Sequence, residues 1–113
     1  MINRALLSLK NWVNTYNSSS KVEHLIEKGW NTLYPINTYI NSDSDDKPYE
    51  GKYKGETSTG FPHAINEIYK QNKSSFRPTP FGNTLTLDFA KAALDAYQLG
   101  RGSATDFLTI CST

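Results

Sequence analysis

The sequence has little cysteine, little histidine and no long apolar run. Its single cysteine, Cys111, cannot form a disulfide within the chain, so a disulfide-stapled scaffold is excluded. No stretch approaches the roughly 18 consecutive apolar residues that cross a bilayer. The apolar run at 5–9 is too short for the core of a signal peptide. We therefore expect a cytoplasmic protein that neither spans nor binds a membrane.

An excess of charge of either sign is also missing. The 113 residues include 12 Lys and Arg against 11 Asp and Glu, which gives a net charge of +1. A clustered basic excess is typical of nucleic-acid binders, so this balance disfavours nucleic acid as a partner. The length fits one domain over residues 1–113.

The strongest helical pattern lies near the C-terminal end. Phe89, Ala93 and Tyr97 recur every four residues, with further apolar residues beside them. This spacing predicts a helix over 84–99 that its neighbours cover on two sides, ended by Gly100. We expect the rest of the chain to pack around this helix.

Weaker helical stripes precede and follow it. They predict helices near 2–17, 21–33 and 62–72, the second with a capping box from Ser20 to Glu23, and a short last helix after Ser103. The two prolines in 76–82 predict an extended connector there. Together the stripes predict an all-α fold, an irregular bundle of four to five helices. Its expected core residues are Leu6, Leu9, Val13, Leu25, Ile26, Phe89 and Leu94.

Residues 41–60 have a different composition from the rest. They are rich in Asp, Gly and Lys and lack helical periodicity, which predicts one long surface loop with room for a short hairpin at 49–54. Loops of this length in small domains are often functional. We expect a binding surface here and on the neighbouring connector, made by Asp43, Asp45, Asp46, Tyr49, Tyr53, Arg77 and Phe81.

The acidic cluster in this loop does not fit a calcium site. An EF-hand loop needs Gly at its sixth position and Glu at its twelfth, but the sequence has Asp46 and Lys52 there. The two histidines and one cysteine also lack the spacing of a zinc site. We expect no metal and no cofactor.

A catalytic alternative centres on His63. A histidine base near Ser58, with Lys54 and Arg77 to hold a phosphate, would be a site for metal-independent RNA cleavage. No second histidine or assembled catalytic set supports it. Whether the protein is an enzyme stays open, and the sequence favours a non-catalytic role.

The interpretation we prefer is a small inhibitor that binds another protein, one with a basic surface, through its Tyr- and Asp-bearing loop. Immunity proteins, antitoxins and phage inhibitors are of this kind. The segment 89–107 resembles the paired helices of colicin-type immunity proteins, over less than a fifth of the chain and without a diagnostic motif. The alternatives are a small nuclease-like toxin or effector domain that uses His63, and a viral or structural component.

Overall fold

The structure, a computed structural model, describes residues 4–112, with side chains described from residue 11 onward. It contains the helices α1 (Arg4–Asn17), α2 (Lys21–Ile26), α3 (Ile65–Gln71) and α4 (Pro80–Tyr97), and a 3-10 turn, η1 (Ile36–Thr38). Within residues 4–112 there is no strand, only one isolated bridge. The expectation that the regular structure is helical is therefore confirmed.

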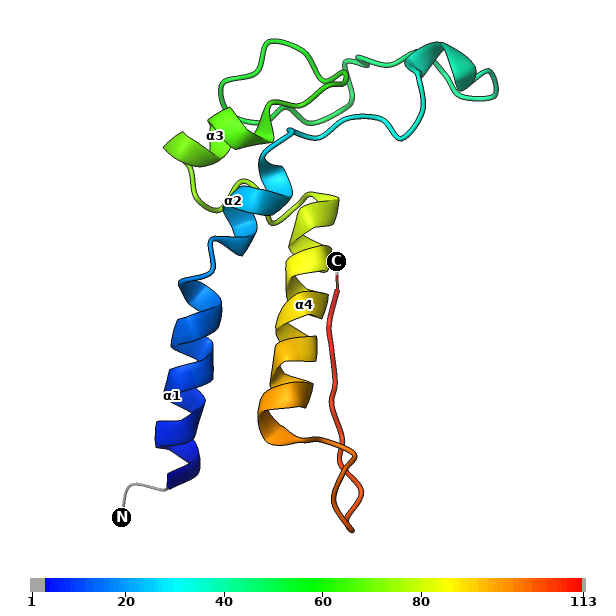
Figure 1. Cartoon of the computed structure of the whole chain (residues 1–113). Helices are drawn as coiled ribbons and strands as arrows, with labels where there is room; N and C mark the ends of the chain where they lie inside the picture. Colours follow the sequence, from blue (N-terminus) through cyan, green and yellow to red (C-terminus); the bar gives the residue numbers. More distant parts are fainter. Residues whose placement is uncertain (1–3, 113) are drawn as a thin grey trace.

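The helices do not gather into a compact bundle. The radius of gyration is 18.8 Å and the principal extents are 57 × 32 × 22 Å. A compact chain of this length has a radius of gyration of about 13 Å. Figure 1 shows α1 and α4 extending to one end of the molecule, while the loop around η1 extends from the other. The molecule is elongated, whereas the predicted bundle would be compact.

Helix α1 packs beside α4 through aromatic side chains. The Trp12 ring lies 5.1 Å from the Phe89 ring and 5.9 Å from the Tyr97 ring, measured between centroids. The Tyr16 hydroxyl donates a hydrogen bond to the Leu85 carbonyl oxygen at 3.2 Å. Helix α1 ends at Asn17, as the run of Asn and Ser predicts. The expected core residues Leu6 and Leu9 lie outside the described side chains.

The buried core lies where α2, α3 and the start of α4 meet. Ile26, Ile65 and Ile68 form its centre, and Ile65 is completely buried. Seven partly buried side chains pack around them: Val22, Leu25, Trp30, Tyr53, Tyr69, Phe76 and Phe81. This junction positions the base of the long loop.

Helix α2 ends well before the predicted residue 33. It ends at Ile26, and Gly29 adopts a left-handed φ of +68°. A Cβ at Gly29 would lie 3.0 Å from the His63 carbonyl oxygen, so this close approach also favours glycine. Ser20 itself is left-handed, with φ 51°, and makes no capping bond through its side chain. The predicted capping box is therefore wrong.

The connector before α4 is a series of turns, whereas we predicted an extended segment. The N–H of Thr79 donates to Phe76 at 3.1 Å, and the N–H of Gly82 donates to Thr79 at 3.0 Å. Pro80 then begins the helix, four residues ahead of the predicted Thr84. Proline suits this position because an N–H there has no helical partner to lose.

The C-terminal part also differs from the prediction. Helix α4 ends at Tyr97, and Gln98 follows in the left-handed region with φ 54°. Beyond a turn, residues 105–112 are extended, so the predicted short last helix is wrong. The segment Phe107 to Cys111 has no polar face at helical spacing, so it lacks the amphipathic pattern typical of a surface helix.

Helix α4 is less covered than its sequence suggests. Ala90 is its only buried residue among those the structure describes. Its large apolar side chains Leu87, Phe89, Leu94 and Tyr97 are exposed. Helices α1 and α2 both contact α4, yet these side chains remain exposed. No described helix combines the length and the apolar content that a membrane crossing needs.

Candidate functional site

The long loop is closed at its base by two backbone hydrogen bonds. Trp30 and His63 form an isolated antiparallel bridge, in which each N–H donates to the other residue's carbonyl oxygen at 2.9 Å. The bridge joins the residues after α2 to those before α3, so residues 31–62 form a closed loop. The Phe61–Pro62 peptide bond next to the bridge is cis.

His63 is enclosed by aromatic rings at this base. Its side chain is buried, and its ring centroid lies 4.7 Å from Phe61, 5.2 Å from Trp30 and 5.5 Å from Tyr53. The helix predicted near 62–72 would place His63 in its first turn, but α3 begins at Ile65, two residues later. The imidazole therefore lies in an aromatic enclosure outside the helix.

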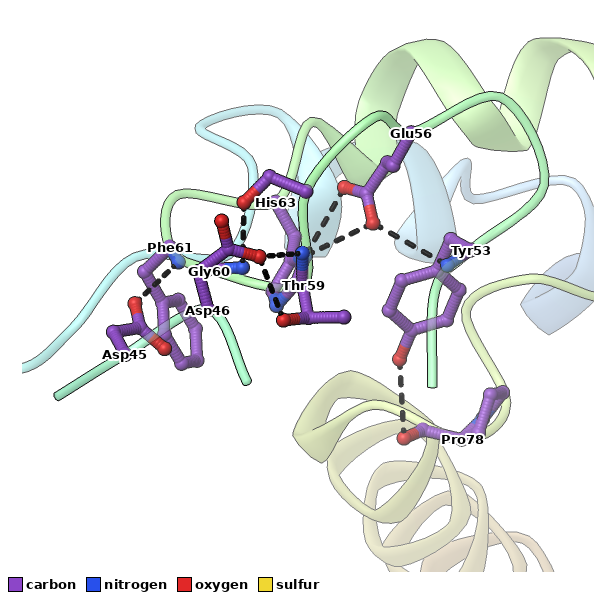
Figure 2. A network of polar contacts seen from close by, with 10 residues as sticks. Asp45, Asp46, Tyr53, Glu56, Thr59, Gly60, Phe61, His63 and Pro78 are labelled. Carbon is purple, nitrogen blue, oxygen red and sulfur yellow. Dashed lines mark hydrogen bonds and ion pairs between the residues drawn. The ribbon is translucent and has the colours of Figure 1, made fainter. Parts of the chain in front are cut away.

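One carboxylate of the closed loop, that of Glu56, holds the His63 imidazole. Glu56 Oε1 lies 3.0 Å from His63 Nδ1, and Oε2 lies 3.1 Å from the same atom (Figure 2). Oε2 also accepts the N–H of Tyr53 at 3.3 Å. Both side chains of the pair are largely buried. Sequence reasoning missed Glu56, since it lies in an aperiodic loop where nothing marks it as the partner of His63.

Tyr53 connects this network to the start of α4. Its hydroxyl donates to the Pro78 carbonyl oxygen at 3.4 Å, as Figure 2 shows. Partial burial, and after it the nearby Glu56 carboxylate, raise the pKa of the Tyr53 hydroxyl above its usual value of 10.0. The phenol thus stays protonated and remains a hydrogen-bond donor at neutral pH.

Two aspartates of the acidic cluster hold the backbone of residues 59–61, just before the bridge. Asp45 Oδ2 accepts the Phe61 N–H at 2.7 Å (Figure 2). Asp46 Oδ1 accepts both the N–H of Thr59 at 2.8 Å and its hydroxyl at 2.9 Å. These two expected partner-binding residues thus bind the chain's own backbone.

The contact of Asp46 gives a pH-dependent prediction. The N–H and hydroxyl of Thr59 lower the pKa of this carboxyl below its usual 3.8. The contact therefore stabilises the loop above pH 3.8, and that stabilisation is lost as the pH falls through the lower folded-state pKa. An NMR titration of the Asp46 carboxyl carbon should give a midpoint below 3.8.

The titration has a simple control. In the variant Asp46→Asn, the Thr59 amide should lose its pH-dependent chemical shift in this range, because no carboxyl remains beside it. A midpoint at or above 3.8 in the unmodified protein would contradict the contact.

The expected partner-binding residues do not form one surface. Asp43, Asp45 and Tyr49 line an open hollow of about 700 Å³ beside Trp30 and Leu33. Asp43 is ion-paired with Lys47 at 2.9 Å, which lowers its carboxyl pKa. Arg77 lines a different hollow, of about 590 Å³. Phe81 lies partly buried against the core.

The residues of the proposed nuclease site are also not joined by the described contacts. His63 Nδ1 faces Glu56, while the Ser58 hydroxyl accepts the Gly60 N–H at 2.9 Å. Lys54 and Arg77 are exposed and make no described hydrogen bond to either. Within residues 4–112, no three His, Cys, Asp or Glu side chains gather closely enough to share a metal ion.

Three curated proteins resemble nearly the whole chain. The alkaline phosphatase PhoV of Synechococcus elongatus is 44% identical over 102 residues. A protein named calcium-transporting ATPase of Myroides odoratus is 44% identical over 105 residues, and the alkaline phosphatase PafA of Elizabethkingia meningoseptica is 43% identical over 103. Each match covers 90% of this chain but only 18–19% of the relative. No protein-family profile matches the chain.

Two solved structures match its fold. The crystal structure of wild-type alkaline phosphatase PafA superimposes with a TM-score of 0.79 at 42% identity, and a variant with four substitutions gives the same values. The match covers 85% of this chain and 19% of the phosphatase chain. The chain thus spans about a fifth of the length of the proteins it resembles.

These similarities overturn the inhibitor interpretation. Identity above 40% along almost the whole chain far outweighs the short resemblance to immunity proteins. That resemblance also required the predicted helix after Ser103, and the structure has no helix there. The antitoxin and phage-inhibitor assignments are wrong, and the nuclease-like and viral alternatives lose their basis. The chain is homologous to one segment of the alkaline phosphatases PafA and PhoV.

Proposed function

We propose that this chain works as a supporting segment of an alkaline-phosphatase-type enzyme, which hydrolyses phosphate esters. The observation that carries the proposal is the PafA match, with a TM-score of 0.79 at 42% identity over 85% of this chain. At such identity, agreement of backbone and sequence together reflects common descent. The remainder of the enzyme, about four-fifths of its length in the relatives, would supply the other parts of its active site.

The shape and surface of the chain support this role. An elongated structure with a radius of gyration of 18.8 Å leaves large apolar side chains such as Phe89, Leu94 and Phe107 exposed. Burying one such side chain completely contributes about 1.5–3 kcal/mol. A larger enzyme that packs against α4 would recover this energy.

The ATPase name of the Myroides relative points to related chemistry. A phosphatase and an ATPase both remove a phosphate group by hydrolysis. We prefer the phosphatase assignment because two of the three curated relatives and both solved structures carry that name.

A chimera tests the proposal. The matching segment of Elizabethkingia PafA is replaced by this chain, and hydrolysis of p-nitrophenyl phosphate and of ATP is measured at alkaline pH. We expect the chimera to hydrolyse p-nitrophenyl phosphate within about tenfold of the parent rate, because 42% identity and a common backbone preserve the packing.

The matched control carries the same segment with its residues in shuffled order, and it should be inactive. A chimera that folds cooperatively yet has lost phosphatase activity would refute the proposal. Preferential hydrolysis of ATP would move the assignment to the ATPase.

A further inference from the structure

The outer part of the closed loop 31–62 surrounds an open hollow of about 700 Å³. Sites for small molecules commonly have volumes of about 300–1,000 Å³. The lining joins residues 30–39, around η1, to residues 42–50 and to Phe61 near the end of the loop. Figure 1 shows the part of the chain around η1 extending away from α1 and α4. The hollow therefore belongs to the loop and not to the contacts between these helices.

Aromatic rings supply much of the apolar surface of this hollow. They belong to Trp30, Tyr39, Tyr49 and Phe61. The rings of Trp30 and Phe61 stand at 90° to each other with their centroids 5.0 Å apart, so they form a right-angled corner. Tyr49 is 78% exposed and makes no described hydrogen bond or ring contact, which leaves its ring available to a ligand. The face of an aromatic ring carries partial negative charge and attracts cations.

The charged groups of the lining are all acidic. They are Asp43, Asp45 and Glu50, and none of the described lining residues is a Lys, Arg or His. Asp43 is paired with Lys47 at 2.9 Å, but the other two carboxylates make no ion pair with a described residue. One oxygen of Asp45 accepts the Phe61 N–H at 2.7 Å, a contact drawn in Figure 2. One oxygen of Glu50 accepts the Lys47 N–H at 3.0 Å. The second oxygen of each has no described hydrogen bond and can attract a positive charge.

This combination of rings and carboxylates selects among ligand classes. An anion such as phosphate would be repelled by the three carboxylates. A divalent metal ion is not favoured, because no three such side chains of the described part of the chain gather closely enough to hold one. A quaternary ammonium group has no N–H to donate, so ring faces and nearby negative charge are the partners that it needs. An organic cation of this kind matches both features of the hollow.

We propose that the hollow binds a small organic cation with a quaternary ammonium group, for which choline is the simplest probe. The corner of Trp30 and Phe61 and the exposed ring of Tyr49 contact its methyl groups. Asp45 and Glu50 balance its charge. A free cation is favoured over the headgroup of a choline lipid, because the phosphate of that headgroup would meet no Lys or Arg in the described lining. The proposal goes beyond the phosphatase assignment and does not depend on it.

Titration of the 113-residue chain with choline chloride tests the site. We expect a dissociation constant of about 1 mM, which is typical of so small a ligand, from NMR shifts of the Trp30 indole N–H. The indole N–H of Trp12, which packs on α4, should not shift. Dimethylbutanol, the uncharged carbon analogue of choline, should bind at least about tenfold more weakly, because it lacks the charge that the rings and carboxylates attract.

Tyrosine variants locate the binding. Tyr49→Ala should weaken choline binding by about 3- to 30-fold, whereas Tyr49→Phe, which keeps the ring, should bind as the parent does. Tyr34 provides the matched control, since it is an exposed tyrosine of the same loop that does not line the hollow. Tyr34→Ala should bind choline within about twofold of the parent. Unchanged binding in Tyr49→Ala would refute the site.

The remaining outcomes each decide the proposal. Equal binding of choline and dimethylbutanol, or no choline binding up to about 10 mM, would refute it. Tighter binding of phosphocholine or of phosphatidylcholine vesicles would identify a lipid headgroup and would also refute it. The titration is then repeated on the PafA chimera. Loss of binding there would mean that the remainder of the enzyme fills the hollow, which overturns the proposal. Binding by a chimera without phosphatase activity would support the site and count only against the proposed function.

Discussion

Replacing His63 by alanine should lower the free energy of unfolding by about 3–5 kcal/mol. The change removes a buried ring that contacts three aromatic side chains, and it leaves the Glu56 carboxylate in a largely buried position without its main partner. Urea unfolding of the chain at neutral pH, followed by tryptophan fluorescence, measures the loss.

The second histidine provides the matched control. His24 is exposed on α2, so His24→Ala should change the unfolding free energy by no more than about 0.5 kcal/mol. The double variant His63→Ala, Glu56→Ala should be less destabilised than the sum of the two single variants, because no unpaired charge remains. Strict additivity would mean that the pair contributes nothing.

Replacing Ile65 by alanine should cost about 2–5 kcal/mol. Ile65 is 0% exposed and touches the other core residues where α2 and α3 meet, and a cavity in such a place is filled only in part by relaxation. The same urea unfolding measures the effect. A loss this large is a considerable share of the stability of a chain of this size.

An exposed isoleucine separates burial from residue type. Ile40 is 84% exposed in the long loop, so Ile40→Ala should leave the unfolding free energy within about 0.5 kcal/mol of the parent. Equal losses for both variants would place the core elsewhere than at the junction of α2 and α3.

Local patterns predicted the helices where their causes were local. The end of α1 at Asn17 follows from the Asn and Ser residues there, and α3 lies within the helix predicted near 62–72. The early end of α2 was not predicted, because only the structure shows that Gly29 has a left-handed backbone that ends the regular path of the helix. The chain then turns to meet His63, a partner that no local pattern indicates.

The site was harder to predict than the helices because it depends on contacts distant in sequence. His63 was singled out from the sequence as a candidate catalytic base, but its surroundings come from Trp30 and Glu56, which have no periodic relation to it. The aspartates were predicted to form a surface for a partner. In the structure they accept hydrogen bonds from Thr59 and Phe61, which are distant in the sequence, so no local pattern indicates these contacts. Sequence reasoning detected the chemistry of these residues but not the directions they face.

Helix α4 shows a different kind of limit. Its wide apolar face predicts cover on two sides, yet within residues 4–112 the contacts with α1 and α2 leave Phe89 and Leu94 exposed. A hydrophobic pattern reports how much surface a helix needs to bury. It does not report which segment of a protein supplies the cover.

The bridge between Trp30 and His63 has a consequence for how such a segment evolves. Because the two ends of the closed loop 31–62 are hydrogen-bonded to each other, its tip around η1 can change in length or composition while α2 and α3 keep their positions. Lengthening a loop whose ends are already joined costs little, since the entropy of closure grows only with the logarithm of its length. The base is thus a fixed frame, and the tip is the part that natural variation can remodel from one relative to the next.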